Sequence, residues 1–459
     1  MMPVILWTDA LIYLLVLIIV LAIYKQQPQG QLYDATQRLL RSPMAITTGM
    51  VLLAFTLVGL LDSLHYRPQL KQTTPTHASQ YGVEVVSVLD TLLQPLRIHD
   101  EKTYSAPLAQ RLYVKENVTL PSGTVVRDYP LLNIMQAAHP SITKLLVRGA
   151  GQGLLFTLLG AAVITWWWAW KRRCSVRVLW QQLQAADNQL PWRSLLGILA
   201  LLILSVTIIA NLAGYYHVLG TDKIGQDVLY STLKSIRTGL LIGTLTTLIM
   251  LPFSILLGIS AGYFGGWLDD VIQYIYTTLN AIPGILLIAA AVLMMQVYIE
   301  SHAAWFDSAA ARTDFRLLFL CVILGITSWT SLCRLLRGET LKLRELDYVR
   351  AARAFGVSNI RIMLRHILPN LYHLVLISVV MDFSGLVLAE AVLSYLGVGV
   401  DPAMQSWGNM INAARLEMAR EPVVWWPLLA AFGFMFVLVL TANLFADSVR
   451  NAFDPRSVR

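Results

Sequence analysis

Two carboxylic acids inside an apolar stretch are the first residues whose position suggests chemistry. Asp382 and Glu390 lie eight residues apart in the stretch Leu371–Leu396, so a helix would place them on one face. Ionisable groups in such stretches are costly to bury and usually face a cavity or a partner. Two interpretations stay open: the acids line a route and meet the amine of a solute, or they bond to neighbouring helices. Asn280, near Pro283 in another apolar stretch, is a further polar candidate for that route.

No set of residues has catalytic or metal-binding spacing. The sequence has no G-x-x-x-x-G-K-[ST] phosphate loop, no G-x-S-x-G nucleophile elbow and no H-E-x-x-H pair. Its 8 histidines are scattered, and its 3 cysteines share no metal-ligand spacing. The glycines of Gly149-Ala-Gly151-Gln-Gly153 open an apolar run, which favours helix packing over nucleotide binding. We therefore expect a protein that is not an enzyme and has no metal or cofactor of its own.

Composition indicates that lipid is the solvent of this chain. Of the 459 residues, 56% are hydrophobic and 14% are charged, and the mean hydropathy is +0.60. A soluble chain carries roughly 25% charged residues. The net charge of +8 lies in short loops between apolar runs, which is the pattern of membrane orientation and argues against nucleic-acid binding.

Nine stretches are apolar over about the 20 residues that a membrane-crossing helix needs. Basic segments follow the first, third, seventh and ninth of them, and all four would lie on one side. Because basic loops stay in the cytoplasm, we expect the N-terminus outside and the C-terminus inside a bacterial inner membrane. The nine stretches are Ile5–Tyr24, Pro43–Leu61, Val147–Trp170, Ser194–Leu212, Thr238–Ala261, Val271–Val297, Leu317–Leu336, Leu371–Leu396 and Pro427–Phe445.

A long polar segment, Asp62–Leu146, separates the second and third of these stretches on the outer side. Its strand-like pieces, Gly82–Leu89 and Arg111–Val114, predict a small extracytoplasmic α+β domain. The predicted fold class is therefore an all-α polytopic membrane protein of about nine transmembrane helices with this insertion. Its predicted parts are two N-terminal spans (1–61), the extracytoplasmic domain (62–146), a helix pair with a basic cytoplasmic loop (147–213) and a core (214–455).

The basic loop from Gly338 to Asn370 is the strongest candidate for a partner site. Its composition predicts a helix over Arg344–Phe355 that ends at Gly356, then a second helix capped by Ser358, with Pro369 at the start of the next span. Small residues would let one face approach a partner closely, and the arginines beside them suit carboxylates. The alternative is a basic loop that meets only anionic lipid. The small residues are Ala351, Ala352 and Ala354.

Five ordered segments resemble the permease subunits of ABC importers, from about Val218 to Pro455. Ala351-Ala352-x-x-x-Gly356 followed by Ile367-Leu368-Pro369 looks like the EAA loop of that family. The run Arg365-His366-Ile367-Leu368-Pro369-Asn370 is similar to the dipeptide and oligopeptide branch, C-type. Arg350 stands where the family has the acid that names the loop, and Glu345 and Asp347 are the nearest carboxylates. The other segments are Leu219–Leu229, Ala261–Trp267, Leu388–Gly397 and Ser406–Met410.

This resemblance implies a permease core that forms a pore with a second, related permease. Two cytoplasmic ATP-binding subunits would bind the loops, and an extracytoplasmic solute-binding protein would deliver peptides or related small solutes. ATP would be bound by those partner subunits, not by this chain. The implied ATPase-coupling residues are Asp347, Arg350, Ala351, Ala352, Arg353, Gly356, Arg365, His366 and Pro369, and the outer gate or docking residues are Gly220, Thr221, Asp222, Gly225, Asp227 and Trp407.

Two other classes stay open at this point. A secondary transporter would need ion or proton sites near the membrane midplane, for which Asp382 and Glu390 are the available groups. A membrane scaffold or sensor would work through the domain at Asp62–Leu146, which carries no recognisable ligand motif.

Overall fold

The computed structural model describes residues 2–24, 31–69, 81–119, 125–135, 140–172, 191–306 and 308–453. Within these ranges, eight helices are long and apolar enough to cross a membrane, and the N-terminal helix α1 (Trp7–Tyr24) is a shorter apolar helix. The predicted polytopic helical fold is therefore confirmed. The eight helices are α3 (Pro43–Asp62), α6 (Ile142–Arg172), α8 (Trp192–Ala213), α9 (Val228–Phe264), α11 (Gly284–Ser301), α12 (Ala309–Arg344), α15 (Leu368–Tyr395) and α17 (Trp426–Phe453).

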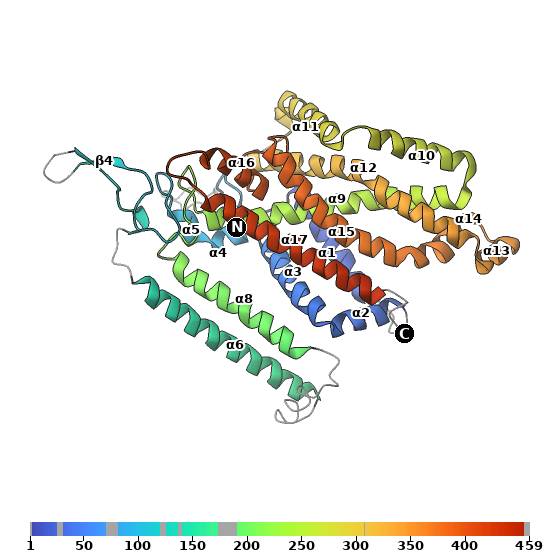
Figure 1. Ribbon diagram of the computed structural model, residues 1–459, viewed down its shortest axis with the longest axis horizontal. Helices are drawn as coiled ribbons and strands as arrows, with labels where there is room; N and C mark the ends of the chain where they lie inside the picture. Colours follow the sequence, from blue (N-terminus) through green and yellow to red (C-terminus); the bar gives the residue numbers. More distant parts are fainter. Residues whose placement is uncertain are drawn as a thin grey trace, which may run out of the picture.

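Helices α9 and α12 lie side by side and form the centre of the bundle, with α15 and α17 packed beside them (Figure 1). Glycines allow the close approach. A Cβ on Gly262 would lie 2.6 Å from the Cβ of Thr340, and a Cβ on Gly243 would lie 2.4 Å from the ring of Phe383. Small residues at helix crossings are the usual means of packing helices in a membrane, where lipid removes the hydrophobic driving force.

The sixth predicted span is wrong as a single helix. Residues Gly266–Ala281 form α10, Ile282 is extended with φ −86° and ψ 130°, and α11 begins at Gly284. Pro283 explains the break, because proline disfavours helical backbone at the residue before it and has no N–H to donate. Only α11 is apolar enough to count as a span, whereas α10 presents one polar face.

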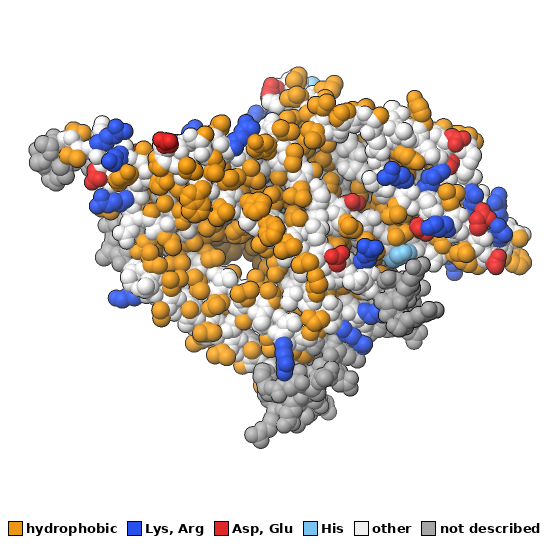
Figure 2. Space-filling view, in the orientation of Figure 1, with side chains coloured by type: hydrophobic (Ala, Val, Ile, Leu, Met, Phe, Trp, Pro, Cys, Tyr) orange, Lys and Arg blue, Asp and Glu red, His pale blue; other side chains and the backbone are white. Residues whose placement is uncertain are grey.

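Helices α6 and α8 pair at the edge of the bundle, beside α3 (Figure 1). A Cβ on Gly149 would lie 2.9 Å from the backbone of Ile208, and a Cβ on Gly153 would lie 2.6 Å from the hydroxyl of Thr207. The glycine run therefore packs helices, as predicted. Hydrophobic side chains cover the middle of the face shown in Figure 2, whereas Lys, Arg, Asp and Glu gather toward its two ends. That distribution suits a molecule surrounded by lipid.

The described residues between α3 and α6 form the predicted α+β insertion, which spans 63–69, 81–119, 125–135 and 140–141. Strand β1 (Met2–Val4) joins it in an antiparallel three-stranded sheet of order β1-β2-β3, and β4 pairs with β5. Of the two predicted strand pieces, Gly82–Leu89 contains only the two-residue β3, and Arg111–Val114 contributes one bridge from Arg111 to Leu131. The elements are β2 (His65–Arg67), β3 (Val86–Ser87), α4 (Val88–Leu92), α5 (Gln94–Ile98), β4 (Glu116–Thr119), β5 (Val125–Asp128) and η1 (Asn133–Met135).

Short helices cap both ends of the bundle. At the end opposite the insertion lie α13 (Asp347–Ala354) and α14 (Asn359–Ile362), followed by the π-helical turn Met363–Ile367 (Figure 1). Near the insertion, α16 (Trp407–Glu417) packs against α15 and α17. Helix α2 (Gln31–Arg41) precedes α3, and a short 3-10 turn, η2 (Ala303–Trp305), follows α11. We call the two ends of the bundle the insertion end and the α13 end.

Candidate functional site: a segment at the α13 end and a pocket at the insertion end

The segment 345–367, which we call the coupling segment, is shorter than the predicted loop. Helix α12 continues to Arg344, so Gly338 lies inside a helix, not in a loop. Helix α13 then ends as predicted at Gly356, whose φ is +75° and whose N–H donates to the carbonyl of Arg353 at 3.1 Å. Ser358 precedes α14 with extended backbone, but its side chain makes no capping hydrogen bond.

The coupling segment is fixed to the bundle by apolar and polar contacts. Val349, Ile362 and Ile367 are buried in one cluster with residues of α9, α10, α12 and α15. The hydroxyl of Tyr263, at the end of α9, donates to Oδ1 of Asn359 at 2.9 Å. These contacts fix the segment to the ends of the long helices α9 and α12.

The outward face of the coupling segment carries an apolar side chain that the sequence interpretation did not single out. Phe355 is 85% exposed, and Ala351 and Ala354 beside it are exposed, whereas Ala352 is half-buried against the bundle. A large, fully exposed aromatic residue in an ordered helix end is typical of a protein-binding surface. Its signal in the sequence was its place directly before Gly356, at the end of the predicted helix.

Arg350 lies on this surface at the position where the family it resembles has an acid. Its charge is paired with a carboxylate of the coupling segment. Arg350 forms an ion pair with Glu345, and Arg344 also donates to that carboxylate at 3.2 Å. Hydrogen bonds from Arg350 and then from Arg344 hold the pKa of Glu345 below its usual range. Both partners of the Arg350 pair are exposed, so the pair orients the side chains and adds little stability. Asp347 lies in the first turn of α13.

The other predicted coupling residues surround this face. Arg353 and Arg365 are exposed, and Pro369 lies in the first turn of α15. His366 is half-buried, its ring lies 6.3 Å from the ring of Tyr348, and its carbonyl accepts from Asn370 at 2.7 Å.

The three predicted pathway residues are not brought together. Glu390 is 1% exposed and accepts a hydrogen bond from the hydroxyl of Ser394 at 2.7 Å. Asp382 is half-buried, with no hydrogen bond or ion pair to another described residue. Asn280 is exposed and accepts from the hydroxyl of Thr330 at 3.1 Å. Within the described residues, these groups therefore occupy three separate environments.

At the insertion end, the predicted gate segment Gly220–Asp227 is covered by the insertion. The hydroxyl of Thr221 accepts from the backbone N–H of Ser105 at 2.6 Å and donates to the carbonyl of Thr103 at 2.9 Å. Gly220 and Gly225 have φ of +74° and +82°, and a Cβ on either would overlap the backbone of the insertion. The segment Gly220–Asp227 is therefore the part of the core against which the insertion packs.

A buried histidine joins this segment to the insertion and was also missed. His217 is 1% exposed, its Nδ1 lies 2.7 Å from Asp227, and its Nε2 lies 3.7 Å from Glu101. Burial alone would lower the pKa of His217, but the carboxylates of Asp227 and then Glu101 outweigh it and raise that pKa to about 9. His217 is therefore cationic at neutral pH. Asp227 also caps α9 by accepting from the N–H of Leu229 at 2.8 Å.

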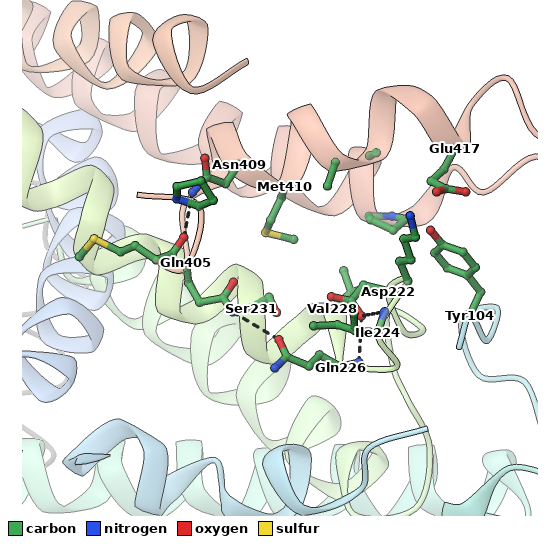
Figure 3. A pocket seen from close by; sticks show the side chains of 16 residues that line it. Tyr104, Asp222, Ile224, Gln226, Val228, Ser231, Gln405, Asn409, Met410 and Glu417 are labelled. Atoms are coloured by element: carbon green, nitrogen blue, oxygen red, sulfur yellow. Dashed lines mark hydrogen bonds between the residues drawn. The ribbon is translucent and has the colours of Figure 1, made fainter. Parts of the chain in front are cut away.

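A pocket of about 210 Å³ opens between this segment and α16. Figure 3 shows Glu417 and Tyr104 at one end of the pocket and Gln405 at the other, with Met410 between them. Trp407 does not line the pocket: it is 1% exposed, and its indole N–H donates to the carbonyl of Thr232 at 3.2 Å. The pocket therefore joins residues from the insertion, from the gate segment and from α16.

Comparisons with known proteins show the family of this chain. A family model described as "Binding-protein-dependent transport system inner membrane component" matches residues 254–459. The oligopeptide transport system permease protein OppC of Mycobacterium tuberculosis is 31% identical over 244 residues, which cover 53% of this chain and 77% of that protein. The chain belongs to the family of ABC importer permeases. This membership separates it from secondary transporters and from sensors.

Further relatives of this permease carry related descriptions. The glutathione transport system permease protein GsiD of Pectobacterium atrosepticum is 35% identical over 241 residues, covering 52% of this chain and 73% of that protein. The dipeptide transport system permease protein DppC of Lactococcus lactis is 29% identical, covering 52% and 64%. A solved structure of the MetNI methionine ABC transporter covers 50% of this chain at 16% identity with a TM-score of 0.37, a likeness too low to add to the assignment.

Proposed function

We propose that this permease subunit forms, with a second related permease, the pore of an importer for peptides. The described relatives act on oligopeptides, dipeptides and glutathione, which share a free amine, a carboxylate and peptide bonds. The insertion end faces outward, where a solute-binding protein releases its cargo, and the α13 end faces the cytoplasm, with the C-terminus on that side. Arg350, Arg353, Arg361 and Arg365 of the coupling segment support this orientation.

The coupling segment is the contact with the ATP-binding subunits, and Phe355 is the observation that carries this assignment. Its side chain is 85% exposed on a helix end that is held by buried neighbours. An apolar anchor on a rigid base is what a partner groove binds most tightly. ATP-driven closure of the partner subunits would move this anchor, and the packed ends of α9 and α12 would follow.

The test compares Phe355→Ala with Phe432→Ala in the intact complex, purified from membranes. Phe432 is 54% exposed on α17, in the apolar part of the molecule, so it controls for loss of an exposed aromatic ring. We expect Phe355→Ala to reduce both the ATP-binding subunits recovered with this chain and the uptake of radiolabelled trialanine, while Phe432→Ala changes neither. Full recovery and uptake with Phe355→Ala would contradict the assignment.

A further inference from the structure

The pocket at the insertion end contains a buried hydroxyl that has no partner. Ser231, in the first turns of α9, is 4% exposed, and its Oγ makes no hydrogen bond within the described structure. The neighbouring serine on this helix, Ser235, donates to the carbonyl of Ser231 at 2.7 Å. The hydroxyl of Thr246, further along α9, is also unpaired, but of the two only Ser231 lines the pocket. Leaving a buried polar group unpaired is costly, and such groups in native proteins commonly face a ligand or a bound water.

Other polar groups of the pocket also have unused bonding capacity. The Oδ1 atom of Asp222 accepts from the N–H of Ile224 at 3.0 Å and of Gln226 at 2.9 Å, and the N–H of Gly225 also bonds to this carboxylate. The amide of Gln405 makes one long contact, 3.4 Å, to the amide oxygen of Gln226. Acceptors and amide groups therefore line the same cavity (Figure 3).

Two carboxylates that could hold a cation, those of Asp222 and Glu417, line the pocket. Glu417 has a side chain that is 16% exposed and accepts from the hydroxyl of Tyr104, and its ion pair with Arg420 is long, at 3.4 Å. Burial raises the pKa of Asp222 despite its backbone hydrogen bonds, so a positive ligand group would relieve an unfavourable carboxylate. Lys223 also lines the pocket but is exposed, and the guanidinium of Arg420 lies 5.4 Å from the centre of the Tyr104 ring.

We propose that this pocket binds the amino-terminal residue of a peptide on its way into the pore. Asp222 and Glu417 would hold the ammonium group, and Ser231 and the glutamine amides would bond to the first peptide group. The volume, about 210 Å³, is below the roughly 300–1,000 Å³ of pockets that enclose a whole drug-sized ligand, which suits one end of a peptide and not a whole oligopeptide. This inference rests on the proposed function and names the part of the solute that the outer mouth recognises.

The experiment measures binding and uptake with two probes, trialanine and N-acetyltrialanine. Binding is followed by calorimetry on the intact complex in nanodiscs without the binding protein, and uptake is followed in cells. The variants are Asp222→Asn, Glu417→Gln and Ser231→Ala. The control is Ser254→Ala, another buried serine of α9, whose hydroxyl is satisfied by the carbonyls of Met250 and Trp329 and lies outside the pocket.

We expect wild type to bind trialanine more tightly than the acetylated peptide. Asp222→Asn and Glu417→Gln should weaken trialanine binding about tenfold or more and remove the preference for the free amine. Asn and Gln keep an acceptor for the local hydrogen bonds, so the change reports the charge. Ser231→Ala should weaken both probes by about fivefold, the effect of one neutral hydrogen bond. Ser254→Ala should leave the affinity for both probes unchanged.

Several results would overturn the proposal. If Ser231→Ala stabilised the complex and left binding unchanged, the pocket would hold only water. If the variants lowered uptake of both probes equally and also reduced stimulation by the binding protein, the surface would serve docking of that protein. Normal peptide uptake in every variant would refute the pocket proposal but would not affect the proposed transport function. Absence of any peptide uptake by wild-type cells would remove both.

Discussion

Replacing Gly225 by alanine should loosen the insertion from the permease core. A Cβ on Gly225 would lie 1.7 Å from the carbonyl oxygen of Glu101, and the φ of Gly225 is +82°. The carbonyl of Gly225 also accepts the N–H of Glu101 at 3.1 Å, so the overlap falls on a hydrogen-bonded contact between the insertion and the core. The side chain cannot be accommodated unless one backbone moves away from the other.

The size of the effect can be separated into two parts with a matched control. Gly397 has nearly the same φ, +80°, but a Cβ there would meet nothing within 4 Å. Gly397→Ala therefore has only the cost of left-handed backbone, about 1–2 kcal/mol. Gly225→Ala adds the overlap, for which overpacking costs of about 1–3 kcal/mol are typical. That difference should raise the population of the undocked insertion by roughly 5-fold to 150-fold over the control.

Hydrogen–deuterium exchange of the complex measures this opening directly. The N–H groups of Glu101, Thr221 and Leu108 bond across the boundary between the insertion and the core and should exchange faster in Gly225→Ala. The same amides should be unchanged in Gly397→Ala. Equal exchange in the two variants would refute the contact on which the reasoning depends.

Three further predictions concern other parts of the molecule. His217 has a pKa raised from 6.5 to about 9, so it stabilises docking of the insertion fully below pH 6.5, and this stabilisation, about 3 kcal/mol, is lost as the pH rises through 9. Protease cleavage of the insertion should therefore increase over this range in wild type and stay flat in His217→Gln. Gly356→Pro should uncouple ATP hydrolysis from uptake, because proline cannot adopt φ +75° and has no N–H to donate at the end of α13. Gly397→Pro controls for a general loss of stability, since Gly397 also has a positive φ. Coupled ATP hydrolysis and uptake in Gly356→Pro would contradict this prediction. Asp382→Asn should change the ratio of lysine-rich to neutral peptide uptake with normal assembly, and an unchanged ratio would assign the acid a structural role.

Hydropathy predicted the arrangement of membrane helices because lipid imposes it on each segment separately. A helix must present about 20 apolar residues whatever its neighbours are, so Pro43–Leu61 and α3 differ by one residue. Gly356 predicted the end of α13, but the break at Ile282 was missed, because hydropathy joined Val271–Val297 into one stretch. The insertion was predicted only as α+β, since strands of two to four residues leave no periodic pattern.

The site residues that were missed depend on contacts between distant parts of the chain. Glu101 and His217 are 116 residues apart in sequence, and neither has a local pattern that indicates the other. Ser231 looks like any helix serine until its surroundings show that its hydroxyl is unpaired. Phe355 looks like a core residue by type, and only the packing of α13 shows that it points outward. These features depend on tertiary contacts, and no local sequence pattern predicts such contacts.

Helix α9 connects the two candidate sites in one continuous element. Its 37 residues span about 55 Å at 1.5 Å per residue, well beyond the roughly 30 Å of a hydrocarbon core, so it reaches out of the bilayer at both ends. Its first turns carry Ser231 in the pocket, and its last turn carries Tyr263, which bonds to Asn359 of the coupling segment. A displacement at either end is therefore transmitted as movement of one helix, and Pro252 is the position at which α9 would bend, because proline removes an internal hydrogen bond. Under the proposed function, a solute in the pocket and ATP-binding subunits at the coupling segment would communicate through α9, because this helix contacts both candidate sites.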